Sequence, residues 1–341
     1  MIILQIITLC ELGGAQSVVI NLANELCKKH EVIVASGEGD GKMWAMLNPK
    51  IKQEHCQHLK RALSPINDFR TLFTFWNLYR KYKPDVIHLH SSKAGMLGRI
   101  AFPSSKVIYT VHGFDSIRLA YRKFLPIERF MQRFCKAIVG VSKYDEKWMK
   151  EEGIIKNVHT IYNGIKKIES ASYPLPFESQ RKKILCIARI SKQKKLELFL
   201  ETAQLLPEYD FIWIGNQYEI KEHPSNVYFL GNIPNASIYN EETNVFMLPS
   251  NYEGLPMVII EAMSYKRPIV ASNVGGISEI VQNGENGFTV ENTAEEFAKR
   301  IKEILEDEDK YIQFSQNSYK RVLQDLTVEK MVESYLELYK K

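Results

Sequence analysis

Residues 248–265 read Leu248-Pro249-Ser250-Asn251-Tyr252-Glu253-Gly254-Leu255-Pro256-Met257-Val258-Ile259-Ile260-Glu261-Ala262-Met263-Ser264-Tyr265. The apolar run of residues 245–248 ends at the Pro-Ser-Asn turn. Pro256 favours the start of a helix, because the missing N–H of proline costs nothing at the first helical position. The stretch therefore predicts a strand, a turn that carries Glu253, and a helix that carries Glu261.

Two carboxylates in this stretch stand eight residues apart, one before the helix and one within it. The helical rise of ~1.5 Å per residue and the loop before it predict roughly 10 Å between Glu253 and Glu261. That distance is too long for an acid and a base acting on one bond, but it suits two groups that hold the ends of an elongated ligand. The backbone amides of residues 253–255 and the helix dipole favour an anion beside them. The alternative is a loop glutamate and a surface glutamate with no shared ligand.

The string Pro-Ser-x-x-Glu-Gly-x-Pro-x-x-x-x-Glu-Ala resembles the Glu-x7-Glu motif of the retaining glycosyltransferase family 4, which has the GT-B fold. The resemblance implies an α/β protein of two doubly wound, Rossmann-like parallel-sheet domains that face a cleft. It also implies that Glu253 contacts the donor hexose and that Glu261 binds the ribose of the nucleotide. Gly254, Leu255 and Pro256 then belong to the donor-binding set.

Length and composition indicate a two-domain globular chain. The chain has 341 residues, of which 45% are apolar, and no window of ~18 uncharged apolar residues predicts a transmembrane helix. The N-terminal apolar residues lack a basic start and a cleavage site, so they predict a buried strand rather than a signal peptide. Five scattered cysteines without a CxxC pair indicate reduced, mostly buried thiols of a cytosolic protein.

Charge is unevenly distributed. Residues 1–165 contain 24 Lys and Arg against 14 Asp and Glu, whereas residues 166–341 contain 21 against 26. The basic first half suggests an anionic partner. Residues 117–136 combine cations with aromatic residues, which predicts either an interfacial surface on anionic lipid or an ordinary solvated face over an aromatic core. No nucleic-acid-binding module accompanies the charge, so a nucleic-acid partner is not expected.

The first half predicts alternating strands and helices, with two candidate ligand positions. A strand over residues 2–8 is followed by a turn with Gly13 and Gly14, where a phosphate could approach the backbone. His112 follows a strand over residues 107–111, at the end of a parallel strand where α/β sheets bind ligands. The resemblance implies that the glycine turn faces the donor diphosphate and that His112 contacts the donor sugar. A tight turn and a turn histidine without ligands are the alternatives.

The second half repeats the strand–helix rhythm. Arg189 and Lys194 follow a strand over residues 184–188, and two cations five residues apart could clamp a diphosphate. They correspond to the family's Gly-Arg-x4-Lys-Gly, but Ala188 and Lys195 stand in place of its glycines. Neighbouring Lys192 and Lys195 leave the choice of lysine open. The resemblance also implies that the loop with Ile233 packs the nucleotide base.

Other patterns receive structural interpretations. His88 and His90 alternate on a strand, and hydrogen-bonded histidines are favoured over a metal site because no third ligand is evident. The aromatic residues of a helix over residues 68–83 are expected to be core. The Asp307-Glu308-Asp309 sequence lies between two helices and is rejected as a metal–nucleotide motif.

The expected divisions are residues 1–165 for acceptor binding, a linker at 166–181, residues 182–325 for donor binding, and a C-terminal helix, 326–341, that crosses back to the first domain.

The implied reaction moves a hexose or an N-acetylhexosamine from a nucleotide diphosphate, most often UDP in this family, to an acceptor hydroxyl with the anomeric configuration kept. Arg189, Lys194, the glycine turn and the amides after Glu253 would stabilise the departing diphosphate, so neither a divalent metal nor a cofactor is expected. Replacing Glu253 or Arg189 by alanine is predicted to abolish transfer and leave folding intact.

The Gly-Gly-Ala-Gln turn and the Ser-Ser-Lys-Ala-Gly stretch at residues 91–95 resemble transferases of capsule, exopolysaccharide or O-antigen assembly, which act on undecaprenyl-diphosphate sugars at the inner membrane face.

Two other functions remain open from the sequence. Non-hydrolysing UDP-N-acetylglucosamine 2-epimerases share the two-domain fold, although the Glu-x7-Glu stretch favours transfer. A nucleotide-sugar-binding subunit without activity of its own is the other alternative, and the joint presence of Arg189, Lys194, Glu253 and Glu261 disfavours it.

Overall fold

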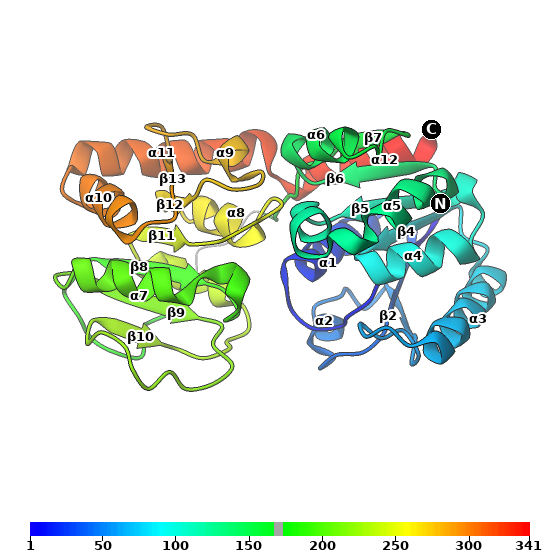
Figure 1. Ribbon diagram of the computed structural model, residues 1–341, viewed down its shortest axis with the longest axis horizontal. Helices are drawn as coiled ribbons and strands as arrows, with labels where there is room; N and C mark the ends of the chain where they lie inside the picture. The colour runs from blue at the N-terminus through cyan, green and yellow to red at the C-terminus, as the bar shows by residue number, and fades with distance from the viewer. Residues whose placement is uncertain (167–172) are drawn as a thin grey trace. The chain divides into compact units, whose positions relative to one another are not determined.

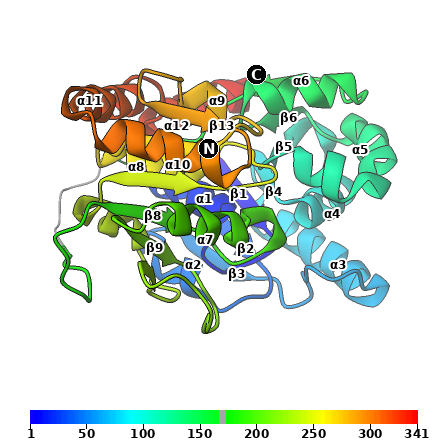
Figure 2. The same ribbon diagram turned by 60° about the vertical axis from the view of Figure 1, so that its left-hand side comes forward.

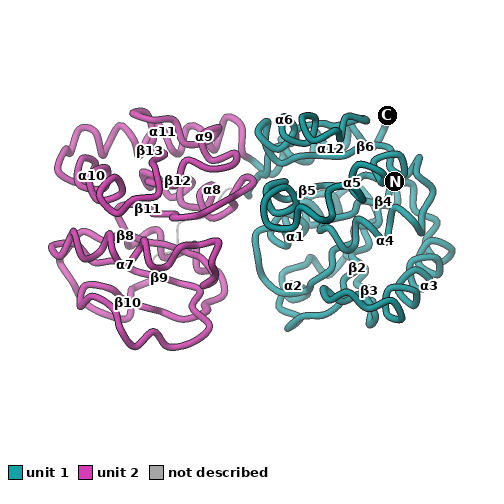
Figure 3. Tube along the Cα trace, viewed as in Figure 1, with its two compact units in different colours: residues 1–166, 327–341 teal, residues 167–326 magenta. Residues whose placement is uncertain are grey.

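Strands and helices alternate along most of the described chain in the computed structural model, which describes residues 1–166 and 173–341 (Figure 1). The chain forms two units, residues 1–166 with 327–341 and residues 167–326 (Figure 3). The first stretch of unit 1 ends at residue 166 and unit 2 ends at residue 326, whereas the expected ends are residues 165 and 325. Residues 167–172 of the expected linker lie outside the described residues.

Unit 1 is built on one parallel sheet of seven strands in the order β3-β2-β1-β4-β5-β6-β7. Its strands are β1 (Ile2–Ile7), β2 (Glu31–Ser36), β3 (Lys52–His55), β4 (Val86–His90), β5 (Val107–Val111), β6 (Ala137–Gly140) and β7 (Val158–Thr160). Its helices are α1 (Gly14–Leu26), α2 (Lys42–Ala45), α3 (Pro65–Tyr82), α4 (Ser92–Ala101), α5 (Leu125–Met131), α6 (Lys143–Glu151) and α12 (Val328–Lys340). The central strands are buried on both faces, which explains their continuous apolar runs.

Right-handed crossovers distribute the helices of unit 1 over the two faces of the sheet. The connections that run outward from β1 to β2 place α1 on one face, and α12 packs against it. The connections from β3 through β6 run in the opposite direction and place α3, α4 and α5 on the other face. Gly95 and Gly98 allow α4 to approach the sheet, since a Cβ at either would clash with Tyr109 or Leu89.

The C-terminal helix α12 belongs to unit 1. Ile165 pairs with Thr327 in a parallel bridge, and the Val328 amide donates to the Ile165 carbonyl at 2.9 Å. Tyr335 and Tyr339 are buried, and their hydroxyls lie 2.9 and 2.7 Å from Thr110 Oγ1 and His88 Nδ1. The thirteen-residue helix α12 is therefore held by polar contacts to side chains of β4 and β5 as well as by apolar packing.

Unit 2 is built on a parallel sheet of six strands in the order β10-β9-β8-β11-β12-β13. Its strands are β8 (Lys183–Ile187), β9 (Asp210–Ile214), β10 (Val227–Phe229), β11 (Val245–Leu248), β12 (Ile269–Ser272) and β13 (Gly287–Val290). Its helices are α7 (Leu196–Leu205), α8 (Met257–Ser264), α9 (Ile277–Ile280), α10 (Ala294–Leu305) and α11 (Glu308–Asp325). Helix α7 packs with α10 and α8 with α11, as Figures 1 and 2 show. The expected pair of doubly wound parallel-sheet domains is confirmed.

One expectation for unit 1 is wrong. The helix expected over residues 68–83 begins at Pro65, and only some of its aromatic side chains are core. Phe75 is buried and Leu72 and Tyr79 are partly buried, but Phe73 and Trp76 are exposed. The helix is longer than expected, and its outer face carries apolar residues that periodicity alone assigns to the interior.

Several smaller expectations are met. Cys10, Cys56, Cys135 and Cys186 are buried and unbridged, and Cys27 is partly exposed. Asp307 is the N-cap of α11, where its Oδ1 accepts a hydrogen bond from the Lys310 amide at 3.0 Å, so the Asp-x-Asp sequence has a structural explanation. No helix among the described residues is long and apolar enough to span a bilayer.

Candidate active site

The predicted donor-binding residues of unit 2 follow the two strands at which the order of the sheet reverses. β8 and β11 are neighbours, and the chain leaves them toward opposite edges, to β9 and to β12. In open α/β sheets, ligands bind at the carboxyl ends of such a strand pair. Arg189 and Lys194 follow β8, and Glu253 follows β11. The topology therefore brings together side chains that lie more than fifty residues apart in the sequence.

Glu253 lies at the centre of a polar cluster. Its Oε1 forms an ion pair with Lys194 and accepts a hydrogen bond from the Ser250 hydroxyl at 2.7 Å. The Lys194 and Glu253 side chains are 17% and 8% exposed, so their charges interact with little screening by water. Among the three candidate lysines, the structure joins Lys194 to Glu253, whereas Lys192 is exposed.

Backbone contacts fix the two loops that carry this pair. The Asn251 amide donates to the Gln193 carbonyl at 2.8 Å, and Gln193 Nε2 donates to the Tyr252 carbonyl at 2.8 Å. Asn251 Nδ2 also donates to the carbonyl of Lys192 at 2.7 Å. These bonds join the loop after β8 to the loop after β11. They therefore hold the backbones that carry Lys194 and Glu253 in position even without the ion pair between the two side chains.

The Gly275-Gly276 turn packs against the backbone of Glu253 and Gly254. Gly275 has a φ of +58°, and a Cβ there would lie 1.9 Å from the Glu253 carbonyl oxygen. The Gly276 amide donates to the Gly254 carbonyl at 2.9 Å. The glycine-rich turn, which the sequence suggests is fold-forming, thus sets the position of the backbone that carries the carboxylate.

Gly275→Ala is expected to destabilise the protein and reduce its activity. An alanine in the left-handed region costs ~1–2 kcal/mol, and displacing the Glu253 carbonyl adds ~1–3 kcal/mol. Gly284→Ala is the matched control, because Gly284 has a φ of +79° and a Cβ there would meet nothing within 4 Å. Thermal unfolding of both variants isolates the clash. Equal shifts in their melting temperatures would contradict this explanation.

The departures from the family's glycines are accommodated differently at the two positions. Lys195 adopts a left-handed conformation, with φ 40° and ψ 58°, and is the N-cap of α7. A glycine would adopt it without strain, which explains the residue that the family prefers. Ala188 is buried, and its amide continues the β8–β9 ladder to the Ile214 carbonyl at 2.9 Å. Arg189, the next residue, is exposed.

Glu261 lies in α8, whose N-cap is Pro256 rather than the residue before it. The expected helix therefore starts one residue late. Burial raises the pKa of the Glu261 carboxyl to about 7. Among the described residues, no side chain donates a hydrogen bond to this carboxyl group. A carboxyl group that is dehydrated and lacks a cation is suited to accept hydrogen bonds from a ligand. Gly254, Leu255 and Pro256, which precede it, are buried.

The loop after β10 contains Ile233, which is partly exposed. Gly231 begins this loop with a φ of +82°, its carbonyl accepts from the Gly215 amide at 2.7 Å, and its amide donates to Asn216 Oδ1 at 2.8 Å. The backbone of the loop is thus fixed to the end of β9, and the Ile233 side chain offers an aliphatic surface beside it.

The candidate residues of unit 1 also lie near a reversal of strand order, between β1 and β4. Gly13 and Gly14 follow β1, and Gly14 is the first residue of α1. The Gly13 carbonyl accepts from the Ser17 amide at 2.8 Å, so the turn leads directly into the helix. The helix begins without a side-chain cap, which leaves its first amides accessible to an anion.

His112 is one of three neighbouring histidines. Its Nε2 lies 3.0 Å from His90 Nδ1, and His88 is bonded to Tyr339 and Thr110. Burial lowers the pKa of His112 to about 4, so its imidazole is neutral at neutral pH. The expectation of hydrogen-bonded histidines on this strand is confirmed. His112 can therefore take part in hydrogen bonding to a ligand but does not supply a positive charge.

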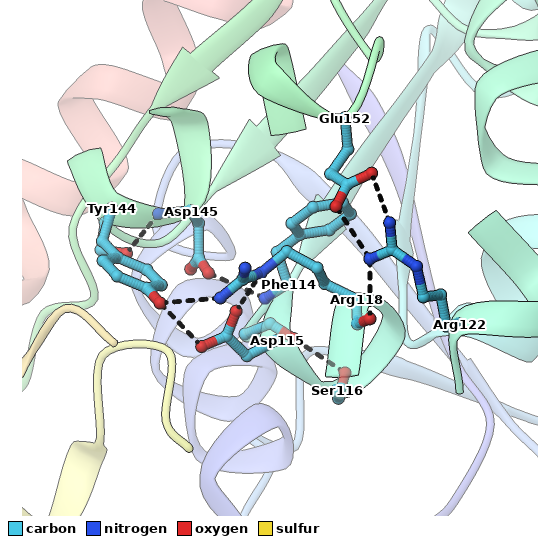
Figure 4. Close-up of polar contacts among 10 residues, drawn as sticks. Phe114, Asp115, Ser116, Arg118, Arg122, Tyr144, Asp145 and Glu152 are labelled. Atoms are coloured by element: carbon cyan, nitrogen blue, oxygen red, sulfur yellow. Dashed lines mark hydrogen bonds and ion pairs between the residues drawn. The ribbon is translucent and has the colours of Figure 1, made fainter. Parts of the chain in front are cut away.

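The turn after His112 is anchored by residues of the next strand–helix unit. The Phe114 amide donates to Asp145 Oδ1 at 2.7 Å, and Ser116 donates to the Gly113 carbonyl at 2.8 Å (Figure 4). Asp145 is fully buried in the first turn of α6. These contacts fix the backbone on the C-terminal side of the histidine.

The basic segment at residues 117–136 has fewer available cations than its composition suggests. Arg118 pairs with Asp115 at 2.8 Å, and Arg122 pairs with Glu152 (Figure 4). Arg118 also lies over the Trp148 ring, and Arg129 pairs with Glu152 as well. Pro126 lies in the first turn of α5. The segment nevertheless exposes aromatic side chains, those of Tyr121 and Phe130 among them.

Sequence reasoning missed three residues that support these sites. Ser250 donates to Glu253, His90 contacts His112, and Gly275 fixes the Glu253 backbone. Each had a signal in the sequence. Ser250 precedes Glu253 by three residues, His90 ends a strand just as His112 follows one, and Gly275 belongs to a pair of glycines after a strand. The partners of His90 and Gly275 could not be identified from the sequence, because each pair joins residues that follow or end different strands.

Two family models match consecutive parts of the chain. The model described as Glycosyltransferase Family 4 matches residues 12–167, and the one described as Glycosyl transferases group 1 matches residues 167–321. A protein of the cps region of Klebsiella pneumoniae is 30% identical over 77% of this chain and 80% of its own length. The chain belongs to glycosyltransferase family 4. The recognition of this family from the Glu253–Glu261 stretch is confirmed.

Other comparisons extend over most of the family 4 chain. A UDP-Gal:alpha-D-GlcNAc-diphosphoundecaprenol alpha-1,3-galactosyltransferase of Escherichia coli is 26% identical, over 88% of this chain and 86% of its own. The crystal structure of Anabaena HepE in complex with UDP and glucose superposes with a TM-score of 0.84 and 20% identity, and the alignment covers 99% of each chain. This structural likeness supports the GT-B fold of the family 4 chain.

Proposed function

We propose that this family 4 glycosyltransferase moves a hexose or an N-acetylhexosamine from a UDP-sugar to a sugar hydroxyl of a lipid-linked acceptor, in bacterial surface polysaccharide synthesis. The observation that carries the proposal is the buried cluster of Lys194, Glu253 and Ser250, at the strand reversal of unit 2. The similarity to a galactosyltransferase named for a diphosphoundecaprenol acceptor supports the acceptor class. The likeness to a structure containing UDP and glucose agrees with the donor class.

The proposed chemistry is substitution at the anomeric carbon with retention. The bond from that carbon to the diphosphate oxygen breaks, the bond to the acceptor oxygen forms on the same face, and the acceptor proton passes to the departing diphosphate. Negative charge grows on the diphosphate, and Lys194 and Arg189 would stabilise it electrostatically. Glu253 would orient the hexose and Glu261 the ribose, while His112, Gly13 and Gly14 keep the donor-contacting roles that family resemblance assigns.

Lys194 has a specific part in this proposal, because it is already paired with Glu253 before any donor binds. A diphosphate oxygen would share or replace the carboxylate as the partner of the ammonium, and the released carboxylate would accept hydrogen bonds from the sugar. The ion pair thus holds two opposite charges together in a mostly buried site, so that each compensates the charge of the other. We propose that no divalent metal is needed, since Lys194 and Arg189 would supply positive charge to the diphosphate.

A binding panel followed by a transfer assay tests the proposal. UDP, GDP and ADP are compared by thermal shift, and UDP is expected to stabilise the protein most. Transfer from UDP-sugars to a short-chain diphospholipid saccharide is then followed with and without EDTA, and the anomeric configuration of the product is read by NMR. Product of inverted configuration, or loss of activity with EDTA, would reject the corresponding part of the proposal. An epimer formed from UDP-N-acetylglucosamine alone would favour the epimerase alternative.

The pH dependence of UDP binding tests the proposed role of Glu261. Its pKa is raised by burial to about 7, so the carboxylate is converted to the neutral acid as the pH falls through 7. The neutral acid is a weaker acceptor for the ribose hydroxyls, and UDP affinity is expected to fall up to about tenfold per pH unit below 7. Calorimetric titrations at pH 6 and 8 measure the change. Glu261→Gln should remove this part of the dependence, and an unchanged pH profile in that variant would contradict the assignment.

Glu261 also predicts a pH dependence of stability. The pKa of the Glu261 carboxyl is higher in the folded state than in the unfolded state. The stabilisation from its protonation is therefore fully present at pH values below the unfolded-state pKa. It is lost as the pH rises through the folded-state pKa of about 7. The ligand-free protein should therefore gain more stability from Glu261→Gln at pH 8 than at pH 5, as measured by the difference in melting temperature. With UDP bound, Glu261→Gln should instead be the less stable form at pH 8, because the proposed complex uses the Glu261 carboxylate.

A further inference from the structure

Helix α3 exposes apolar side chains that a helix covering a sheet would normally bury. On its own outer face Ile66 is 69% exposed, Phe69 74%, Phe73 60% and Trp76 44%, while Leu63, just before the helix, is 66% exposed. Exposed apolar residues are common singly, but a contiguous group of this kind marks an interaction surface.

The four residues of the helix form one stripe. Their spacing of three, four and three residues places Ile66, Phe69, Phe73 and Trp76 on a single helical face. The Phe73 and Trp76 rings lie 5.8 Å apart, and the Arg80 guanidinium lies 4.6 Å from the centre of the Trp76 ring. Aromatic rings beside a cation are the composition of helices that lie in a membrane interface.

The neighbouring helices extend this surface. Helix α4 contacts α3 and exposes Ile100, and the buried Arg99–Glu128 ion pair joins α4 to α5. Phe130 of α5 is 54% exposed, with the Arg133 guanidinium 4.6 Å from its ring centre. Apolar rings flanked by arginine therefore occur on both sides of α4, in the layer that covers one face of the sheet (Figure 1).

The charge of this part of the chain is complementary to an anionic surface. Residues 60–136 contain 15 Lys and Arg against 4 Asp and Glu, whereas the rest of the chain contains 30 against 36. Three of the four acidic side chains are neutralised within the unit, by Lys93, Arg118 and Arg99. Arg70 and Arg80 of α3 are exposed, so cations border the apolar stripe, whereas the exposed Lys81 pairs with Glu54.

We infer that the outer face of α3 is the membrane-docking element of this protein. Ile66, Phe69, Phe73 and Trp76 insert at the boundary of headgroups and acyl chains of an anionic phospholipid bilayer. Arg70 and Arg80 contact the lipid phosphates. The 117–136 segment, which the Arg99–Glu128 pair joins to α4, contributes Phe130 and Arg133, while Arg118, Arg122 and Arg129 remain engaged with Asp115 and Glu152. The inference rests on the proposed function for the membrane location, because a lipid-linked acceptor lies in a bilayer.

Vesicle binding tests this inference independently of catalysis. The full-length protein is sedimented with vesicles of phosphatidylglycerol and phosphatidylcholine or of phosphatidylcholine alone. We expect at least about tenfold stronger partitioning to the anionic vesicles. Phe69→Glu/Phe73→Glu should reduce that partitioning at least tenfold, because it removes apolar area and places two negative charges against anionic lipid. Ile312→Glu/Leu323→Glu is the matched control: these α11 residues are 45% and 46% exposed, and their replacement should leave partitioning unchanged.

Further measurements separate the possible failures. Melting temperature and UDP binding should be the same in wild type and the α3 variant, because the altered side chains are exposed. Transfer to a water-soluble acceptor should also be unchanged. If wild type binds vesicles but transfers no sugar, the proposed function fails and the docking inference stands. If the α3 variant partitions like wild type, or if wild type forms a dimer without vesicles that the variant abolishes, the docking inference is wrong.

Discussion

Glu253→Gln is expected to lower the rate of sugar transfer by about 10²- to 10³-fold, the loss typical of removing one preorganised group from an active site. The amide matches the carboxylate in shape and can still accept a hydrogen bond from Ser250, so the loop should remain in place. It cannot form the ion pair with Lys194 or bind sugar hydroxyls as strongly as a carboxylate does. The loss should therefore lie mainly in kcat.

The measurement is UDP release coupled to product detection, with acceptor and donor at saturation. Glu285→Gln provides the control, because Glu285 is exposed and its side chain has no role in the cluster. The melting temperature of Glu253→Gln should stay close to that of wild type. Turnover within a fewfold of wild type in this variant would remove Glu253 from the proposed mechanism.

Lys194→Met is expected to weaken UDP binding by about 10- to 100-fold, corresponding to the ~1.5–3 kcal/mol of a charged hydrogen bond. Turnover should fall as well, because the negative charge on the diphosphate is larger in the transition state than in the bound donor. Methionine retains most of the length and apolar volume of the lysine stem. Its substitution leaves the Glu253 carboxylate partly buried without its cation, and a modest loss of stability is expected.

Lys192→Met is the matched control for the lysine variant, because Lys192 belongs to the same helical turn but is exposed. Isothermal titration with UDP compares the two variants with wild type. Arg189→Ala should resemble Lys194→Met in its effect on turnover if both cations act on the diphosphate. Equal losses in the Lys192 and Lys194 variants would show that the effect comes from general charge, and would contradict the specific role of Lys194.

The sequence by itself determined the family, the two parallel-sheet domains and most of the candidate residues. Apolar runs ending in glycine or polar turns predicted the strands, because a strand buried on both faces must be continuously apolar. The Glu253–Glu261 stretch is specific because a turn, a proline and a helix occur in a fixed order around two carboxylates. These signals are local, and they need no knowledge of which strands are neighbours.

The tertiary structure decided what depends on neighbours. The adjacency of β8 and β11 joins Lys194, and not Lys192, to Glu253. The adjacency of β11 and β12 brings Gly275 against the Glu253 backbone. Packing also determined which face of α3 is covered, because helical periodicity locates an apolar stripe but does not say what it meets. Likewise, Glu152 engages Arg122 and Arg129 across a gap of more than twenty residues, which composition could not reveal. The physical reason is common to all three cases: hydrogen bonds, ion pairs and burial depend on distance in space, which the strand order sets.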